Sequence, residues 1–423
     1  MNRTRLLILA TSAVTLLISA CSQPQDLTEP EVTPQYGTSD FDSASLVASN
    51  EAGYVYTLGT IDDESEEYSE GVLKRFDTSG KELWSHKLNT SPYNFCSTHC
   101  EARNFGLSVD TAGNVYALHG LKDEPSEHVE RKAWLSKLST SGTLLWKVTI
   151  YGDDGFGGID NLGGSTAMVT TAEGETFVAY TLRKVVYGDG SFDYSSSFHL
   201  AKFSASGKKL FDKSLAIDYP SDAAITKNGL LYLVGGGEVA KYSNTGTLLW
   251  KRSLPIKPYS SHQQIAVGNA KVYVSTNTNE RFGSENHSIA LYRYTTSGTK
   301  VWERTLTKPS GSDKIELSGL SADAEGNVHL VGVTDGYKIT FGDTGNAAGD
   351  FFVRKYTPLG NSAWTYAPKL PSTNEFANNV SAGDSGRVYV VGETNAKVNG
   401  KNYGHTDAFL IRLDTSGKKV WSR

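Results

Sequence analysis

The sequence predicts an all-β fold: a seven-bladed β-propeller of four-stranded antiparallel blades, preceded by a signal segment and a tether. Two repeated patterns predict it. A thirteen-residue pattern occurs seven times, as in Leu73–Ser85 (LKRFDTSGKELWS) and Leu410–Ser422 (LIRLDTSGKKVWS). A second pattern, in which a glycine turn leads into an apolar strand such as Gly113–Gly120 (GNVYALHG), precedes each copy. Because internal repeats reveal the architecture before local structure does, we expect one repeat unit per blade.

The first twenty residues have the organisation of an export signal. Two arginines in Met1–Arg5 precede an apolar run, Leu6–Ile18, and small residues then lead to Cys21. The stretch Ile18–Cys21 (ISAC) resembles a bacterial lipobox. That resemblance implies cleavage after residues 1–20 and lipidation of Cys21. A plain secretory signal with a chance cysteine is the alternative.

Residues 21–42 are expected to form a lipidated, flexible tether. The stretch Ser22–Asp42 is rich in Pro, Gln, Thr and acidic residues and has few apolar side chains, so it cannot bury enough surface to fold. Several acyl chains on Cys21 would hold the protein stably at a membrane. By the lipobox resemblance, serine after the cysteine implies the outer membrane or cell surface. No later segment has the roughly eighteen continuous apolar residues of a membrane span.

Residues 43–423 are expected to form the propeller, with four strands in each repeat unit. In the second unit these are Gly106–Asp110, Asn114–Gly120, Trp134–Thr140 and Thr143–Thr149. Alternation of apolar and polar residues, with many Tyr, Val and Leu, favours strands over helices. Roughly 54 residues per unit match a propeller blade. A solenoid is the alternative, but it would need polar capping repeats at both ends.

Turns, aromatics and blade order give three further expectations. Glycines such as Gly80 and Gly113 stand where a hairpin bulge requires a positive φ. One aromatic residue four positions after each second-turn glycine should pack between neighbouring blades and belong to the core rather than to a ligand cage. The first and last units both look complete, so we expect no strand swapped across the ring closure. The aromatic residues are Trp84, Trp146, Phe211, Trp250, Trp302, Trp364 and Trp421.

The repeat GNVYxxG…DAFLxRLDTSGxxxW, clearest between Gly386 and Trp421, resembles the bacterial SBBP-type seven-bladed β-propeller repeat. It is also similar, more distantly, to the LYALDxxTGKxLW blade of quinoprotein-like propellers. The resemblance covers nearly everything after the tether. It implies an exported or surface protein without an assigned chemistry, because the repeated residues build strands and turns and a fold does not supply a function.

Composition and motifs exclude several function classes. A formal net charge of −5 offers no basic surface for nucleic acid. The nine histidines include no H-E-x-x-H, and no G-x-S-x-G elbow is present. We therefore expect no enzyme, no cofactor and no metal, although a site assembled from several blades would leave no such motif.

Cys96 and Cys100 are the remaining cysteines, in the stretch NFCSTHC. In an exported protein a local disulfide is the favoured interpretation. A metal site formed with His99 is the alternative, but it has no obvious fourth ligand.

Acidic, glycine-rich loops at residues 150–164, 187–193 and 341–350 are candidate calcium sites. None has the D-x-[DN]-x-[DN]-G spacing, so we interpret them as solvated turns. The acidic run 61–70 is interpreted in the same way, as a solvated loop that a cationic partner would also fit.

A ligand of a propeller is expected at the mouth of the central channel, where the chain enters each innermost strand. The default alternative is a wet channel lining. The polar residues at these positions, which suit a polar ligand, a peptide or a cation, are Asn104, Thr166, Asp222, His262, Gln263, Glu316 and Asn378.

Two function hypotheses follow. The first is a non-enzymatic, lipid-anchored protein of the bacterial cell envelope, whose monomeric propeller binds or scaffolds an envelope protein or glycan. The second is a propeller enzyme, lyase or quinoprotein-like, with its site at the channel mouth. A quinoprotein would need a cofactor-stacking aromatic and a calcium cluster, which cannot be assigned in this sequence.

Overall fold

The computed structural model describes residues 42–63, 68–88, 99–124, 131–151, 166–188, 191–255, 262–278, 288–310, 312, 314–334, 350–368, 375–383, 385–395 and 406–423. They all lie in one structural unit, Thr33–Arg423, and form 28 strands. Within this described part there is no helix.

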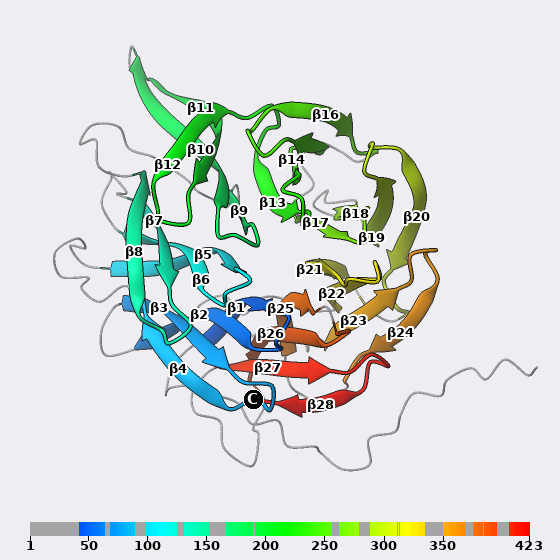
Figure 1. Cartoon of the computed structure of the whole chain (residues 1–423). Helices are drawn as coiled ribbons and strands as arrows, with labels where there is room; N and C mark the ends of the chain where they lie inside the picture. The colour runs from blue at the N-terminus through cyan, green and yellow to red at the C-terminus, as the bar shows by residue number, and fades with distance from the viewer. Residues whose placement is uncertain are drawn as a thin grey trace, which may run out of the picture. The chain divides into compact units, whose positions relative to one another are not determined.

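The strands follow one another as seven blades, each running from an inner to an outer strand (Figure 1). Blade 1 contains β1 (Asp42–Ser49), β2 (Val55–Asp63), β3 (Tyr68–Phe76) and β4 (Glu82–Lys87). Blade 2 contains β5 (His99–Val109), β6 (Val115–Glu124), β7 (Arg131–Leu138) and β8 (Leu144–Tyr151). Blade 3 contains β9 (Thr166–Thr170), β10 (Thr176–Gly188), β11 (Ser191–Phe203) and β12 (Lys209–Ser214). Blade 4 contains β13 (Pro220–Ile225), β14 (Leu231–Gly235), β15 (Glu238–Tyr242) and β16 (Leu248–Ser253). Blade 5 contains β17 (Gln263–Gly268), β18 (Lys271–Thr278), β19 (Ser288–Thr295) and β20 (Lys300–Thr307). Blade 6 contains β21 (Ile315–Ala322), β22 (Val328–Thr334), β23 (Asp350–Tyr356) and β24 (Ser362–Tyr366). Blade 7 contains β25 (Glu375–Ala382), β26 (Val388–Thr394), β27 (Asp407–Leu413) and β28 (Lys419–Ser422).

Each blade is an antiparallel meander, as the sequence predicts, and consecutive strands supply every blade. The inner strands lie side by side around a central channel, and β25 of the last blade packs against β1 of the first. The expectation that no strand is swapped across the closure is therefore confirmed. One parallel bridge, between Tyr68 of β3 and Cys100 of β5, additionally joins the first two blades into one eight-stranded sheet.

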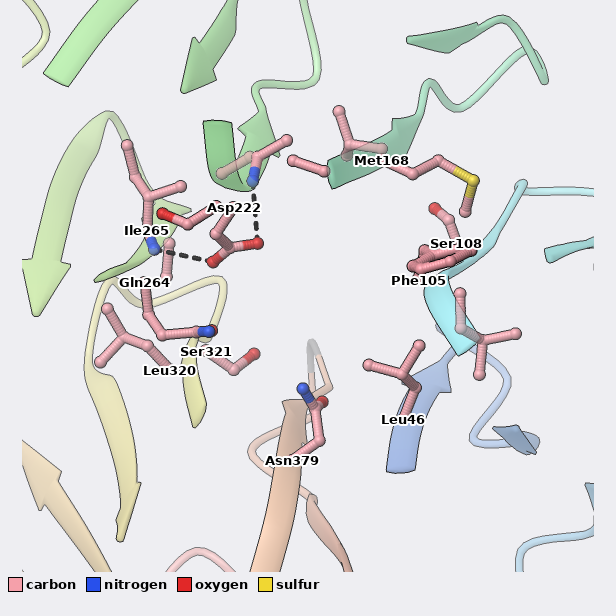
Figure 2. A pocket seen from close by; sticks show the side chains of 18 of the residues that line it. Leu46, Phe105, Ser108, Met168, Asp222, Gln264, Ile265, Leu320, Ser321 and Asn379 are labelled. Atoms are coloured by element: carbon pink, nitrogen blue, oxygen red, sulfur yellow. Dashed lines mark hydrogen bonds between the residues drawn. The ribbon is translucent and has the colours of Figure 1, made fainter. Parts of the chain in front are cut away.

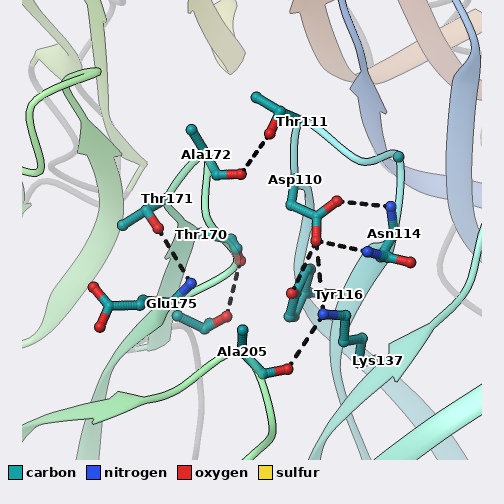
Figure 3. Close-up of polar contacts among 12 residues, drawn as sticks. Asp110, Thr111, Asn114, Tyr116, Lys137, Thr170, Thr171, Ala172, Glu175 and Ala205 are labelled. Atoms are coloured by element: carbon teal, nitrogen blue, oxygen red, sulfur yellow. Dashed lines mark hydrogen bonds and ion pairs between the residues drawn. The ribbon is translucent and has the colours of Figure 1, made fainter.

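Side chains from the last blade hold the first blade at the closure. The Tyr389 hydroxyl donates to the Gly53 carbonyl at 3.0 Å, and the Asn378 amide donates to the Ala44 carbonyl at 3.1 Å. Tyr56 and Tyr273 use their buried hydroxyls in the same way as Tyr389, on the first turn of the blade that follows. Tyr116 departs from this pattern and donates to Asp110 of its own blade at 3.1 Å (Figure 3), and the buried Tyr232 hydroxyl has no partner among the described residues.

The outer-strand aromatics lie between blades, as expected, although each ring remains partly exposed. The Trp84 indole N–H donates to the Thr140 carbonyl of the next blade at 2.9 Å, and its ring covers Gly142. A Cβ on Gly142 would lie 2.8 Å from that ring, and the residue has φ +83. The equivalent indole bonds run from Trp146 to Ala205, Trp250 to Thr296, Trp302 to Pro358, Trp364 to Thr415 and Trp421 to Thr78.

In most blades, the basic residue of the third strand donates a hydrogen bond to the carbonyl that also accepts the indole N–H. Lys241 donates to the Thr296 carbonyl at 3.0 Å, beside the Trp250 indole. Because one carbonyl oxygen accepts two bonds, tryptophan and cation together clamp the neighbouring turn. The other cations that do so are Arg75, Lys137, Arg293 and Arg412.

The predicted glycine turns are confirmed, with φ +81 at Gly80 and +82 at Gly113. Blade 5 departs from the pattern. There Asn269 and Ala270 take positive φ values of 45 and 55, while Gly268 lies against the Asp323 carbonyl, where a Cβ would overlap it.

Bulges in the inner strands determine which residues face the channel. One bulge is present in each of five inner strands: β1, β5, β13, β21 and β25. At each bulge, one unpaired residue lies between two residues whose partners are consecutive in the second strand of the blade. In β25 this residue is Asn378, between Ala377 and Asn379. A bulge bends the strand and redirects its side chains, and these bulges lie where the channel cavity is lined.

Acid is expected to destabilise the propeller through His329, which takes the tyrosine position in blade 6. The residue is 0% exposed, and neither ring nitrogen has a hydrogen-bond partner among the described residues. Burial, opposed by Asp323 and assisted by Lys355, lowers its pKa from 6.5 to about 4. The unfolded chain therefore binds the proton first. Stability should fall as the pH decreases from about 6.5 to 4, by about 3 kcal/mol in total.

Urea unfolding at a series of pH values tests this, with His329→Phe as the comparison because blade 3 has Phe177 at the same position. The variant should lose about half of the dependence of stability on pH between pH 6.5 and 4. A comparable part should remain, since burial also lowers the pKa of His119 to about 3. An unchanged slope in the variant would show that other groups cause the acid sensitivity.

Candidate functional site

A cavity of about 300 Å³ lies in the central channel, and the inner strands of all seven blades contribute to it (Figure 2). Its polar side is formed by Asp222, Gln264, Ser321 and Asn379, and its apolar side includes Leu46, Phe105 and Met168. Small-molecule sites in proteins combine these features: an apolar wall and a few polar groups that fix orientation.

Asp222 bridges two blades and carries an unusual pKa. It follows the bulge of β13, and its carboxylate accepts the N–H of Ile265 in β17 at 2.7 Å and that of Ala223 at 2.8 Å. Burial raises the pKa of Asp222 to about 7, although both hydrogen bonds lower it. The carboxyl group therefore changes its charge close to neutral pH, and the cavity would change its preference between neutral and cationic ligands.

Two carboxamides point into the cavity from blades 5 and 7, Gln264 from β17 and Asn379 from β25 (Figure 2). Neither side chain has a hydrogen bond to another described residue. The hydroxyl of Thr166 and both amide atoms of Asn104 are buried without a partner in the same described part. Buried polar groups nearly always have a partner, so the two carboxamides and the Thr166 hydroxyl, which line the cavity, are available to a ligand or to water.

Two serines on the cavity wall also connect blades. Ser108 Oγ accepts the Thr170 N–H at 3.2 Å, and Ser321 Oγ accepts the Ala382 N–H at 3.0 Å. Each hydroxyl still has a hydrogen to donate. The cavity can thus offer hydroxyl donors beside two amides and a carboxyl group.

The structure brings two of the predicted channel-mouth residues into the cavity, Thr166 and Asp222. Asn104 precedes the lining residue Phe105. The Gln263 amide oxygen accepts the Gly237 N–H at 3.2 Å, while the next residue lines the cavity.

The remaining three predicted residues are outside the cavity lining. Asn378 holds the first blade, Glu316 pairs with Lys314 at 3.1 Å, and His262 is exposed with φ +60. Sequence reasoning missed Gln264, Ser321 and Asn379, of which two directly follow a residue that it selected.

Several expectations concern residues outside the described part. Cys21, Cys96 and nearly all of the loops 150–164 and 341–350 lie there, and Cys100 is described only as part of β5. The interpretation of 61–70 and 187–193 as solvated loops is wrong for their described residues, which belong to the paired ends of β2 and β3 and of β10 and β11. Among the described residues, no group of three or more His, Cys, Asp or Glu is placed to hold a metal ion. In the same residues no helix is long and apolar enough to cross a membrane.

Comparison with protein families gives a match to outer membrane protein assembly factor BamB over residues 69–340, well over half of the chain. This chain belongs to the BamB family. The match agrees with the propeller built from repeated blades. The finer resemblance to the SBBP repeat stays a prediction. No curated protein matches this BamB family member.

Several solved structures are similar to this BamB family member at low sequence identity. The acylaminoacyl peptidase of Pyrococcus horikoshii is 8% identical, with a TM-score of 0.50, over 90% of this chain and 52% of that one. The Pan2 WD40 domain of Neurospora crassa is 10% identical, with a TM-score of 0.48, over 90% of both chains. A Bacteroides caccae protein of unknown function is 13% identical, with a TM-score of 0.38, over 62% of this chain and 81% of that one.

Proposed function

We propose that this member of the BamB family is a binding or scaffolding module of the bacterial cell envelope, and that its channel cavity binds a ligand without catalysing a reaction. The observation that carries the proposal is the pair of unpartnered carboxamides, Gln264 and Asn379, beside Asp222 in one cavity. The family description, an outer membrane protein assembly factor, supports the envelope location. The export signal and the lipobox-like sequence at Cys21 support a lipid anchor.

The cavity suits a ligand of limited size. About 300 Å³ is at the lower end of ligand pockets, so we propose that a peptide segment or one or two sugar units of an envelope protein or glycan enters it. Amides bond equally well to peptide groups and to sugar hydroxyls. Leu46, Phe105 and Met168 would contact the apolar part of the ligand.

Affinity capture tests the proposal. The immobilised protein is incubated with envelope extract, and retained proteins and glycans are identified by mass spectrometry. Gln264→Leu and Asn379→Leu should each weaken binding of the captured partner about tenfold, the effect of losing one hydrogen bond of about 1.4 kcal/mol. Asn361→Leu is the matched control, because Asn361 is an exposed amide on the outer turn of blade 6.

The outcomes separate the alternatives. If both channel variants retain the partner with unchanged affinity, the binding site lies elsewhere on the propeller. Turnover of an envelope substrate that is lost in Asp222→Asn would instead favour an enzyme, with Asp222 transferring a proton near neutral pH.

A further inference from the structure

Blade 3 carries a polar cluster that is separate from the channel cavity. Ser197 and His199 lie two residues apart in β11, and Asp212 lies in the neighbouring outer strand β12. Side chains two residues apart in a strand point to the same face. Tyr180 of β10 stands directly opposite His199, and Leu182 stands opposite Ser197.

The distances link a hydroxyl, an imidazole and a carboxylate in series. Ser197 Oγ is 3.0 Å from His199 Nε2, and His199 Nδ1 is 3.3 Å from Asp212 Oδ1. The other carboxylate oxygen accepts the Tyr180 hydroxyl at 2.7 Å and pairs with the Lys209 ammonium at 3.3 Å. This is the order of groups that activates a serine in hydrolases, which is recognised by geometry and not by position in the sequence.

The charge of Asp212 determines the tautomer of the histidine. Burial pushes the pKa of Asp212 upward, but the hydrogen bonds from Tyr180 and Lys209 outweigh it, and the pKa lies below 3.8. The group is a carboxylate at neutral pH and only accepts hydrogen bonds. His199 therefore carries its proton on Nδ1, and the lone pair on Nε2 faces the Ser197 hydroxyl.

The imidazole is also held in place while the serine stays accessible. The ring of His199 stacks on the ring of Tyr180, with centroids 5.2 Å apart and an interplanar angle of 22°. His199 and Asp212 are each 26% exposed at their side chains, and Ser197 is exposed. A reagent or substrate in solvent can reach the hydroxyl oxygen without any rearrangement of the blade.

We propose that Ser197 is an activated nucleophile that takes the acyl group of a carboxylic ester. Its Oγ forms a bond to the acyl carbon while the proton passes to His199 Nε2. The bond from that carbon to the ester oxygen breaks, and the leaving alcohol takes the proton from His199. Water then attacks the acyl-serine by the same route, which releases a carboxylic acid and restores the hydroxyl.

The surroundings of Ser197 determine the expected rates of its acylation and deacylation. Ser197 faces solvent, so water would stabilise the oxyanion of the tetrahedral intermediate, whereas preorganised N–H donors typically add about 100-fold or more. We therefore expect clear acylation by activated esters and slow release. Leu182, opposite Ser197, is partly buried against the interface between blades 2 and 3 and gives a short acyl chain an apolar contact.

Two reagents test the proposal on the full chain: p-nitrophenyl acetate and a fluorophosphonate. The fluorophosphonate forms a phosphorus–oxygen bond with loss of fluoride. Intact-mass measurement and peptide mapping should place one acetyl or phosphonyl group on Ser197. Ser197→Ala should abolish the modification and His199→Gln should slow it at least 100-fold. Ser195→Ala, the matched control on the same face of β11, should leave it unchanged.

The role of Asp212 has its own signature. Asp212→Asn should slow acylation and shift the His199 ring toward the other tautomer, measured by nitrogen NMR, while the thermal midpoint shows that the blade remains folded. The proposal is overturned if Ser197 is modified no faster than Ser195, or if His199→Gln reacts at the rate of the unaltered chain.

Discussion

Gly392→Ala is expected to destabilise the propeller by about 3 kcal/mol, the upper end of the usual cost of inserting a methyl group where no space exists. Gly392 lies in β26 opposite Ala377, immediately before the bulge of β25. A Cβ at this position would overlap the Phe376 carbonyl oxygen and would lie 2.6 Å from the Phe409 ring. The carbonyl is part of the main chain, so the inner strand itself would have to move.

Urea unfolding of Gly392→Ala measures this effect, with Gly383→Ala as the control from the same blade. An added Cβ on Gly383 would meet its nearest neighbour at 3.6 Å, an ordinary contact, and we expect a change within about 0.5 kcal/mol. Because β25 carries Asn378 and Asn379, Gly392→Ala should also weaken binding in the channel. Equal stabilities of the two variants would contradict the steric explanation.

The repeat pattern was sufficient to predict the blades, because the same residues perform the same task in each unit. Alternating strands, glycine turns and outer-strand aromatics recur seven times, and the ring closes as expected. The recurrence of a residue type, however, does not reveal its hydrogen-bond partner. The sequence shows Arg or Lys at a fixed place in the third strand, but only the structure shows that Lys241 and Trp250 donate to the same carbonyl.

The candidate site was predictable only in part, because a bulge shifts the register by one residue without a clear mark in the sequence. The sequence predicts Asn378 at the channel mouth, where the chain enters the inner strand, but the bulge in β25 turns it to the Ala44 carbonyl and leaves Asn379 in the cavity. The cluster on blade 3 was missed for a similar reason. Ser197 and His199 meet Asp212 through cross-strand register, and no sequence motif encodes that pairing.

Trp421→Ala is expected to cost about 3 kcal/mol, the lower end for removing a large aromatic, because the ring remains partly exposed. Trp421 packs on Gly80 and donates to the Thr78 carbonyl at 3.1 Å. Arg423 reinforces it by donating to the carbonyls of Gly80 and Ser79, both at 2.8 Å. This joint differs from the other six because no chain segment connects its two blades, so contacts alone hold it closed.

Hydrogen exchange distinguishes local opening of the ring at the closure from a loss of stability of the whole propeller. Trp421→Ala should lose protection selectively in β1 and β28, whereas Trp250→Ala removes the same contact at a joint that the chain itself connects, and its blades should stay together. Opening of the ring in both variants to the same extent would show that the chain connection contributes little.

Trp421→Phe separates packing from hydrogen bonding at the closure. It keeps most of the ring on Gly80 and loses only the indole bond, which is worth about 1 kcal/mol. Blade 3 already uses this solution: Phe211 covers Gly246, and Lys202 donates at 3.3 Å to the Asn244 carbonyl, the position to which the indole would otherwise donate. At the closure Arg412 already donates to the Thr78 carbonyl at 2.9 Å. The carbonyl therefore keeps a donor in Trp421→Phe, and exchange in β1 and β28 should stay close to that of the unaltered chain.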